Sequence, residues 1–341
     1  PLHPREAERL RALHETGLVG ELPDALHEAV VKLASEICGT PIAAVSLVDA
    51  DRQWFSGIHG LECRETPREV AFCAHTILGE APLVVKDATK YYDTKSGPLH
   101  ALDNINMQVR DGEFACVVGP SGCGKTTLLW SIAGLHSLTS GDVVLDGDKV
   151  TGPHPQIGMV FQEANLLPWR NLDKNIEFPF EIKGQRPDRE HIAHLLDRVG
   201  LHGFGGKYPR ELSGGMQQRA AIVRALSFNP SLLLMDEPFG ALDAFTRDEM
   251  NLLVEEIWLE TKKTIVFITH NITEAVFLSD RVFVMSARPG RIANVFDIDF
   301  PRPRSLDLLA TKEVFDLVNT IKVEIQHEPA GAKTTSSLGA A

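Results

Sequence analysis

The sequence is poor in the features that mark several broad classes of protein. It has only five cysteines in 341 residues, and no two of them form a C-x-x-C pair. This scarcity argues against a disulfide framework or a zinc ribbon and favours a reducing compartment. Cys63, Cys73 and His75 match no known spacing of metal ligands, so we expect ordinary packing residues there rather than a metal site.

Excess positive charge and long apolar runs are also missing. The chain carries 46 acidic against 34 basic residues, for a formal net charge of -12. Because a nucleic-acid-binding surface normally shows a basic face, we expect no nucleic acid partner. No apolar run approaches the roughly 20 residues that a membrane-spanning helix needs, and no charged-then-apolar leader opens the chain. These absences lead us to expect a cytoplasmic protein.

The first part of the chain predicts a small set of elements. Residues 22–38 carry apolar side chains at helical spacing, which predicts an amphipathic helix ending before Gly39. Residues 42–48 and 53–58 predict two strands around a short turn, and residues 69–78 predict a second helix. Two strands leave unpaired sheet edges, so a domain of this kind would be marginal without more strands.

The same residues resemble the opening of a GAF domain. The similarity runs from Pro41 through Arg52-Gln53-Trp54-Phe55 to Ala71-Phe72-Cys73-Ala74-His75, about the first half of that family's fold. The resemblance implies a partial α+β segment over residues 1–84, without the second half of the sheet or the wall of the ligand pocket. It stops near Pro82-Leu83-Val84-Val85, so we place a domain boundary near residue 85.

From residue 85 to about 300, short apolar strands alternate with helical stretches. This alternation predicts an α/β domain with a mostly parallel sheet wrapped by helices. Two hairpins are also expected, one turning at Asp111-Gly112 into the strand Phe114–Val118 and one over residues 143–149. Residues 301–341 complete the chain as a C-terminal helix and a disordered tail.

A glycine-rich stretch after the strand Phe114–Val118 predicts a phosphate-binding loop. It reads G-x-x-x-x-G-K-T and leads into a helix, which is the strand, loop and helix order of a P-loop. Backbone N–H groups of such a loop converge on phosphates, Lys125 reaches the β and γ oxygens, and Thr126 offers its hydroxyl to Mg²⁺. The nucleotide-binding residues expected here are Gly119, Pro120, Ser121, Gly122, Cys123, Gly124, Lys125, Thr126 and Thr127.

Three other strands end in polar side chains. Asp236 and Glu237 follow one, Gln162 the next and His270 the third. Because ligands bind beyond the carboxyl ends of parallel strands, we expect these ends to converge with the P-loop on one nucleotide. Asp236 would hold Mg²⁺, and Glu237 would orient the attacking water as general base. Taken alone, Gln162 or His270 would more often be an ordinary hydrogen-bonded residue.

The motif Leu212-Ser213-Gly214-Gly215-Met216-Gln217, ahead of a helix, resembles the signature of ABC transporter ATPases. The resemblance covers about residues 86–300. It implies a P-loop NTPase cassette that hydrolyses ATP, with an antiparallel β subdomain and a helical subdomain at about 164–214. In that family the signature of one cassette covers the ATP held by another, so the resemblance implies a head-to-tail homodimer.

The same resemblance assigns roles to individual residues. Tyr92 matches the aromatic that stacks on adenine, although Tyr91 adjoins it, and Asp243 matches the loop at the dimer interface. Gln162 matches the glutamine that contacts Mg²⁺ and leads to the surface that grips the permease, and His270 matches the histidine at the γ-phosphate. The signature residues expected on the partner's ATP are Ser213, Gly214, Gly215 and Gln217. The expected catalytic residues are Glu237, His270, Gln162 and Lys125, and the expected metal ligands are Thr126, Gln162 and Asp236.

Shorter stretches resemble one branch of that family, the nitrate, sulfonate and taurine importers. They are residues 160–163, 167–170, 239–243 and 300–304. This likeness implies a subunit on the inner face of the cell membrane, with transmembrane permease subunits and, indirectly, a solute-binding protein as partners. Two alternatives stay open: a signalling ATPase gated by the GAF-like segment, and a soluble ABC ATPase acting on ribosomes or chromosomes.

Cys123 lies inside the P-loop. Loop N–H groups and Lys125 would favour its thiolate, so that oxidation or alkylation would block ATP. The alternative is a small residue that the loop tolerates.

Overall fold

The computed structural model describes residues 6–19, 25–60, 63–68, 82–95 and 97–327. The chain divides into two compact units, residues 1–80 and 81–341. The boundary expected near residue 85 would cut strand β4 (Leu83–Thr94), which belongs entirely to the second unit. The predicted helix over residues 69–78 and the predicted tail after His327 lie outside the described residues.

The first unit contains helices α1 (Glu6–Glu15) and α2 (Ala25–Cys38) and a three-stranded antiparallel sheet. The strands are β1 (Ala43–Val48), β2 (Arg52–His59) and β3 (Glu65–Pro67), of which β3 was not predicted. α2 packs on β1 and β2 so closely that a Cβ at Gly57 would lie 2.7 Å from the His27 carbonyl. This approach requires glycine at that position of the strand.

The amphipathic helix predicted over residues 22–38 turns a different face inward than its apolar periodicity suggested. Val31 is buried against the sheet, whereas the apolar stripe Leu26, Val30, Leu33 and Ile37 is exposed within the described part of the unit. The close packing at Gly57 fixes the rotation of α2, so the stripe faces outward.

The second unit is built around a six-stranded sheet in the order β13-β12-β6-β11-β10-β9. Its strands are β6 (Phe114–Val118), β9 (Ile157–Val160), β10 (Leu232–Asp236), β11 (Thr264–Ile268), β12 (Arg281–Met285) and β13 (Ile292–Asp297). All neighbours are parallel except β12 and β13. The carboxyl ends of β6, β9, β10, β11 and β12 therefore meet at one edge, and the sequence predicted this for the first four of them.

A separate antiparallel sheet has the order β5-β4-β7-β8. It consists of β4, β5 (Gly97–Val109), β7 (Ser140–Leu145) and β8 (Asp148–Lys149), and the hairpin predicted over residues 143–149 is confirmed as β7-β8. The hairpin predicted at Asp111-Gly112 is wrong, because β5 and β6 lie in different sheets. All five residues of β6 are buried, which suits a central parallel strand with both faces covered.

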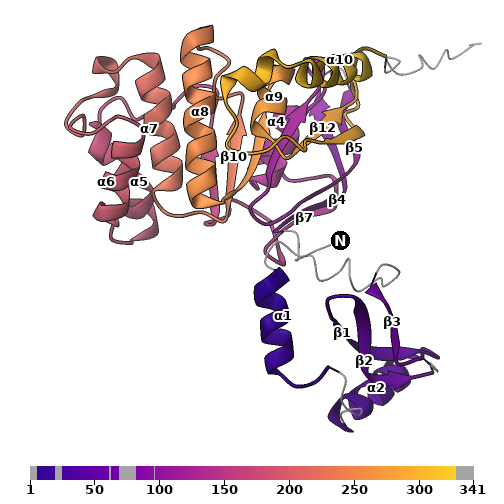
Figure 1. The fold of residues 1–341 in the computed structure, drawn as a ribbon. Helices are drawn as coiled ribbons and strands as arrows, with labels where there is room; N and C mark the ends of the chain where they lie inside the picture. The colour runs from indigo at the N-terminus through magenta and orange to yellow at the C-terminus, as the bar shows by residue number, and fades with distance from the viewer. Residues whose placement is uncertain (1–5, 20–24, 61–62, 69–81, 96, 328–341) are drawn as a thin grey trace, which may run out of the picture. The chain divides into compact units, whose positions relative to one another are not determined.

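One group of helices lies at one end of this unit (Figure 1). α5 (Leu172–Lys183), α6 (Arg189–Arg198) and α7 (Gly214–Leu226) form a helical group at the end away from β4 and β5, with η2 (Pro209–Glu211) before α7. α4 (Lys125–Ile132), α8 (Ala244–Thr261), α9 (Ile272–Leu278), η3 (Leu306–Ala310) and α10 (Lys312–His327) complete the unit. α10 contributes Val314, Val318 and Ile321 to the core, so it belongs to the cassette rather than to a separate tail. Among the described residues, no helix is long and apolar enough to cross a membrane.

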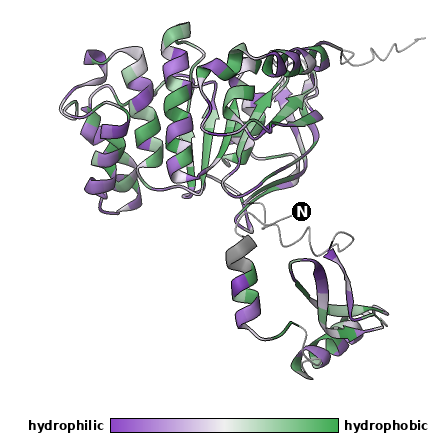
Figure 2. Ribbon diagram, viewed as in Figure 1, coloured by the Kyte–Doolittle hydropathy of each residue, from purple (hydrophilic) through white to green (hydrophobic). Residues whose placement is uncertain are grey.

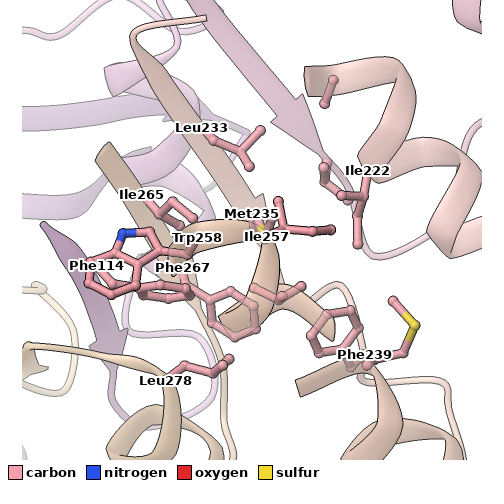
Figure 3. Close-up of a cluster of buried hydrophobic side chains, with 14 of the residues drawn as sticks. Phe114, Ile222, Leu233, Met235, Phe239, Ile257, Trp258, Ile265, Phe267 and Leu278 are labelled. Carbon is pink, nitrogen blue, oxygen red and sulfur yellow. The ribbon is translucent and has the colours of Figure 1, made fainter. Parts of the chain in front are cut away.

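The core forms two clusters on the six-stranded sheet, whose strands are coloured mostly as hydrophobic in Figure 2. Along β6, Phe114, Cys116 and Val118 join one cluster, whereas Ala115 and Val117 join the other. In the first cluster, the rings of Phe114 and Phe267 have centroids 5.9 Å apart, and Figure 3 shows them beside Trp258. This double burial holds the strands, and hence their carboxyl ends, in fixed register.

Arginines after β13 secure α9. Arg304 is 4% exposed and donates to the carbonyl oxygens of Val276, Phe277 and Ser279 at the end of that helix. Burial lowers the pKa of Arg304 to about 10. α9 begins two residues after His270, so this contact holds the helix that follows one of the predicted catalytic residues.

Candidate active site

The predicted P-loop connects β6 to α4. Gly124 has φ 107°, and a Cβ there would lie 3.0 Å from the carbonyl oxygen of Ala101, so the turn into the helix requires glycine. The Lys125 ammonium folds back over the loop and donates to the carbonyl oxygens of Gly119 (2.9 Å) and Pro120 (3.2 Å). The loop thus holds its own lysine in place.

A cavity of about 280 Å³ opens above this loop. The residues that line it are Tyr92, Leu99, Ala101, Ser121, Gly122, Gly124, Lys125, Thr126, Thr127, Glu237 and Arg288. One wall comes from the antiparallel sheet and the floor from the P-loop, so an apolar and aromatic surface faces a surface rich in N–H donors. Such a cavity suits a ligand with a flat ring at one end and phosphates at the other.

Tyr92, rather than its neighbour Tyr91, faces this cavity. Its hydroxyl lies 2.7 Å from Nδ1 of His136, and the two rings meet edge to face. Tyr91 instead stacks on His100, with centroids 4.1 Å apart. His136 was not predicted, because nothing in its surroundings in the sequence links it to a tyrosine 44 residues earlier.

Asp236 and Thr126 meet at the carboxyl end of β10. The Thr126 hydroxyl lies 3.2 Å from Oδ1 of Asp236, and the carboxylate is 8% exposed. Burial raises the pKa of Asp236, the Thr126 hydrogen bond opposes this, and the nearby Glu237 charge adds to the increase. A buried carboxylate paired with a hydroxyl offers the oxygen ligands that Mg²⁺ prefers, and a cation would relieve the cost of its buried charge.

The described residues contain no group of three or more His, Cys, Asp and Glu side chains that could hold a metal by themselves. Mg²⁺ usually takes one or two protein oxygens and completes its shell with water and substrate phosphates, so the pair Thr126 and Asp236 fits that mode. Cys73 and His75, considered as metal ligands from the sequence, lie outside the described residues.

Glu237 and His270 form a hydrogen-bonded pair beside the cavity. Nδ1 of His270 lies 2.9 Å from Oε2 of Glu237. The Glu237 backbone is in the left-handed region, with φ 45°, and its N–H donates to the Ile268 carbonyl at 2.9 Å. A non-glycine residue in this conformation is strained, and here the neighbouring strand holds it.

Gln162, the predicted residue at the end of β9, lies close to Glu237 and His270 around Gly240. A Cβ on Gly240 would lie 3.4 Å from the Glu237 carbonyl oxygen, 3.5 Å from Nε2 of Gln162 and 3.7 Å from Cε1 of His270. The ends of β9, β10 and β11 thus bring these three residues around one glycine. Gln162 is itself exposed, and its side chain stands outside the cavity lining.

The predicted signature residues lie on α7 and are not part of that lining. Ser213 caps α7 by accepting the Met216 N–H at 3.3 Å, and Gly214 is exposed at the same helix start. Gln217 donates from Nε2 to the carbonyl oxygens of Pro209 and Leu212, which fixes the loop before the helix.

Asp243 and Gly215 lie beside these signature residues. Asp243 caps α8 and accepts from the Thr246 N–H at 3.1 Å, and hydrogen bonds from Thr246 lower the pKa of its carboxyl. A Cβ on Gly215 would lie 3.1 Å from Thr246. The starts of α7 and α8 therefore lie close together, and each is capped by a side chain, Ser213 on α7 and Asp243 on α8.

Of the two hypotheses for Cys123, the structure favours the small residue that the loop tolerates over the thiolate. Its side chain is 1% exposed, and burial raises the pKa of the thiol although Lys125 acts in the opposite direction. The sulfur turns away from the cavity, close enough that a Cβ on Gly119 would lie 3.1 Å from it. Cys123 is therefore a packing residue beneath the loop.

Comparisons with known proteins agree with this geometry. A family model described as "ABC transporter" matches residues 102–240. The aliphatic sulfonates import ATP-binding protein of Bacillus cereus is 43% identical over 230 residues, covering 67% of this chain and 91% of that protein. The nitrate import ATP-binding protein of Synechocystis is 48% identical over 221 residues, covering 64% of this chain and 83% of that protein.

A solved structure gives the same fold. The dimeric structure of a bacterial ABC transporter cassette matches with a TM-score of 0.57 and 33% identity, covering 64% of this chain and all of that one.

Proposed function

This chain belongs to the family of ABC transporter ATP-binding proteins, and we propose that it energises an importer of a small anion such as nitrate, a sulfonate or taurine. The observation that carries the proposal is the single cavity in which Tyr92, the P-loop and Glu237 meet. The sulfonate and nitrate import relatives support the choice of branch.

In the proposed reaction ATP lies in this cavity with its ring on Tyr92 and its phosphates on the loop N–H groups. Lys125 exchanges the carbonyl oxygens of Gly119 and Pro120 for phosphate oxygens. Mg²⁺, held by Thr126 and Asp236, neutralises phosphate charge when bound. In this proposal Gln162, which lies beside Glu237 and His270 around Gly240, would be a further ligand of that metal.

Glu237 acts on the attacking water. Its carboxylate accepts a proton as the water oxygen attacks the γ-phosphorus and the bond to the β-phosphate breaks. His270, bonded through Nδ1, fixes the orientation of the carboxylate and leaves Nε2 to face the γ-phosphate. ADP and inorganic phosphate are the products.

A second copy completes the site in this proposal. Ser213, Gly214 and Asp243 are exposed, Gly215 and Gln217 are half-buried beside them, and all five lie outside the cavity of their own chain. Two copies arranged head to tail would place these residues over the partner's ATP, so ATP binding closes the dimer and hydrolysis opens it. The dimeric cassette of known structure supports this arrangement.

The proposed permease contact lies near Trp169, between β9 and α5. The side chain is 71% exposed, which is unusual for tryptophan, and it follows Gln162 by seven residues. Movement at the nucleotide would reach the permease through this short connection. The chain would then act on the inner face of the membrane, with a solute-binding protein delivering the anion on the other side.

The test is transport coupled to hydrolysis. The full chain is expressed together with a candidate permease, and uptake of labelled nitrate and of a labelled sulfonate is measured with ATPase activity. Trp169→Ala should abolish uptake and spare basal hydrolysis, whereas the matched variant Phe315→Ala, at a 64% exposed aromatic on α10, should keep both. Hydrolysis with no uptake of any small anion would reject the importer assignment, and the signalling alternative, which the relatives do not favour, would return.

A further inference from the structure

The loop between β12 and β13, residues 286–291, reaches the nucleotide cavity from outside the motifs described so far. Arg288 in this loop lines the cavity. Its Nε and Nη2 atoms donate to the carbonyl oxygen of Gly122 in the P-loop, at 3.1 and 2.8 Å. Within the described chain, both hydrogen bonds of this guanidinium go to that one oxygen.

The same loop is fastened to the antiparallel sheet. Gly290 donates to the Ala101 carbonyl at 3.0 Å, and its own carbonyl accepts from the Asp103 N–H at 2.9 Å. Arg291 donates from Nε to Oδ2 of Asp103 at 2.8 Å. A Cβ on Gly290 would lie 2.2 Å from the Cys123 carbonyl oxygen, so the loop also presses directly on the P-loop.

Gly122 is the point of the P-loop where such a restraint matters. Its φ of 75° lies in the left-handed region, and glycine can leave that region at little cost. The Gly122 carbonyl and the Cys123 N–H belong to one planar peptide and point in opposite directions. An arginine that holds the carbonyl on the outer side therefore keeps the N–H directed into the loop, where it now makes a long bond of 3.3 Å to the Pro120 carbonyl.

The positive charge of Arg288 also favours nucleotide binding. The guanidinium has five N–H groups, and the two bonds to Gly122 leave donors at the rim of the cavity. A fixed cation beside the phosphate loop favours a polyanion, and the bidentate geometry is one that lysine does not reproduce.

We propose that Arg288 is a positioning residue for the nucleotide, which aims the Gly122–Cys123 peptide at the phosphates and raises the affinity for ADP and ATP. This inference rests on the proposed function, because it takes the cavity as the ATP site. Neither the P-loop pattern nor the strand-end residues include position 288.

The experiment measures ADP binding and ATP turnover on the full chain. Isothermal titration with Mg²⁺-ADP should give a Kd about tenfold higher for Arg288→Ala, the change expected for loss of one charge-assisted hydrogen bond. Arg288→Lys should give an intermediate Kd, because it restores the charge without the two-pronged bond. KM for ATP should rise in parallel, with kcat at saturating ATP within about twofold of the original. The control is Arg189→Ala, which removes the same charge from an 83% exposed side chain on α6.

The outcomes test the positioning role of Arg288 separately from the assignment of the cavity as the ATP site. A Kd for Arg288→Ala equal to that of the original chain would overturn the positioning role. A lower kcat with unchanged Kd, or a lysine variant as weak as alanine with an equal loss of thermal stability, would also overturn it. Failure of the original chain to bind ADP would instead reject the ATP site itself.

Discussion

The two units of this chain differ in how deeply their side chains are buried. In the described part of the first unit, the buried hydrophobic residues are Val31, Val48 and Phe55, whereas two extensive clusters fill both faces of the sheet in the second. All the predicted catalytic residues lie in the second unit. The comparison indicates that precise chemistry here depends on a doubly covered sheet, because only buried strands hold their ends in fixed register.

The largest effect is expected at Glu237. Glu237→Gln keeps the shape of the side chain but removes the base, and should lower kcat at least a hundredfold in a phosphate-release assay. The matched variant Glu65→Gln, on β3 of the first unit, should leave kcat unchanged, because that carboxylate only pairs with Arg52 at the surface. Turnover by Glu237→Gln within a few-fold of the original chain would remove Glu237 from the base role.

Next in size is the core of the cassette. Phe267→Ala removes a fully buried ring that packs against Phe114 and Phe239, and should lower the free energy of unfolding of this unit by about 3–5 kcal/mol. Urea unfolding followed by the loss of ATPase activity measures it. Phe55→Ala in the first unit should leave the urea midpoint of the activity loss unchanged. A decrease in that midpoint similar to the one for Phe267→Ala would show that the two units unfold together.

A smaller effect on stability is expected to distinguish two N-terminal truncations of the chain. Removal of residues 1–80 should leave the cassette as stable as before. Removal of residues 1–84 also deletes Leu83, which is fully buried and pairs with Val109 and Leu145, and should cost about 2–3 kcal/mol more. Thermal unfolding of the two proteins tests this, and equal melting temperatures would place the structural boundary beyond Leu83.

The smallest effect is expected from alkylation. Iodoacetamide should modify Cys63, which is exposed in the first unit, well before Cys123, whose thiol is buried and has a raised pKa. Mass spectrometry of the peptides gives the order, and ATPase activity should persist while Cys63 reacts. Modification of Cys123 at a similar rate, with loss of ADP binding, would contradict this prediction and support the hypothesis of a reactive thiolate in the P-loop.

Much of the second unit could be predicted because its signals are local. The P-loop, Asp236, Glu237 and His270 each follow an apolar strand directly, and a parallel sheet brings such ends together. The hairpin at Asp111-Gly112 failed because a turn sequence does not reveal whether the next strand joins the same sheet. The sequence left two hypotheses open for Cys123, because the direction of one side chain within a loop depends on its packing.

Contacts between distant segments account for the rest. Arg288 meets Gly122 across 166 residues, and no spacing pattern in a single sequence connects them. The outward stripe on α2 shows the same limit, since helical periodicity identifies an apolar face but not the rotation that packing against Gly57 imposes.

The hold of Lys125 on its own loop makes nucleotide binding an exchange of partners. The ammonium is 7% exposed and already bonded to two carbonyl oxygens, so an incoming anion must outcompete an internal ligand. A small monovalent anion replaces one of these bonds and offers little to the surrounding N–H groups. A triphosphate replaces both bonds at once, so this loop would favour a polyphosphate over small monovalent anions.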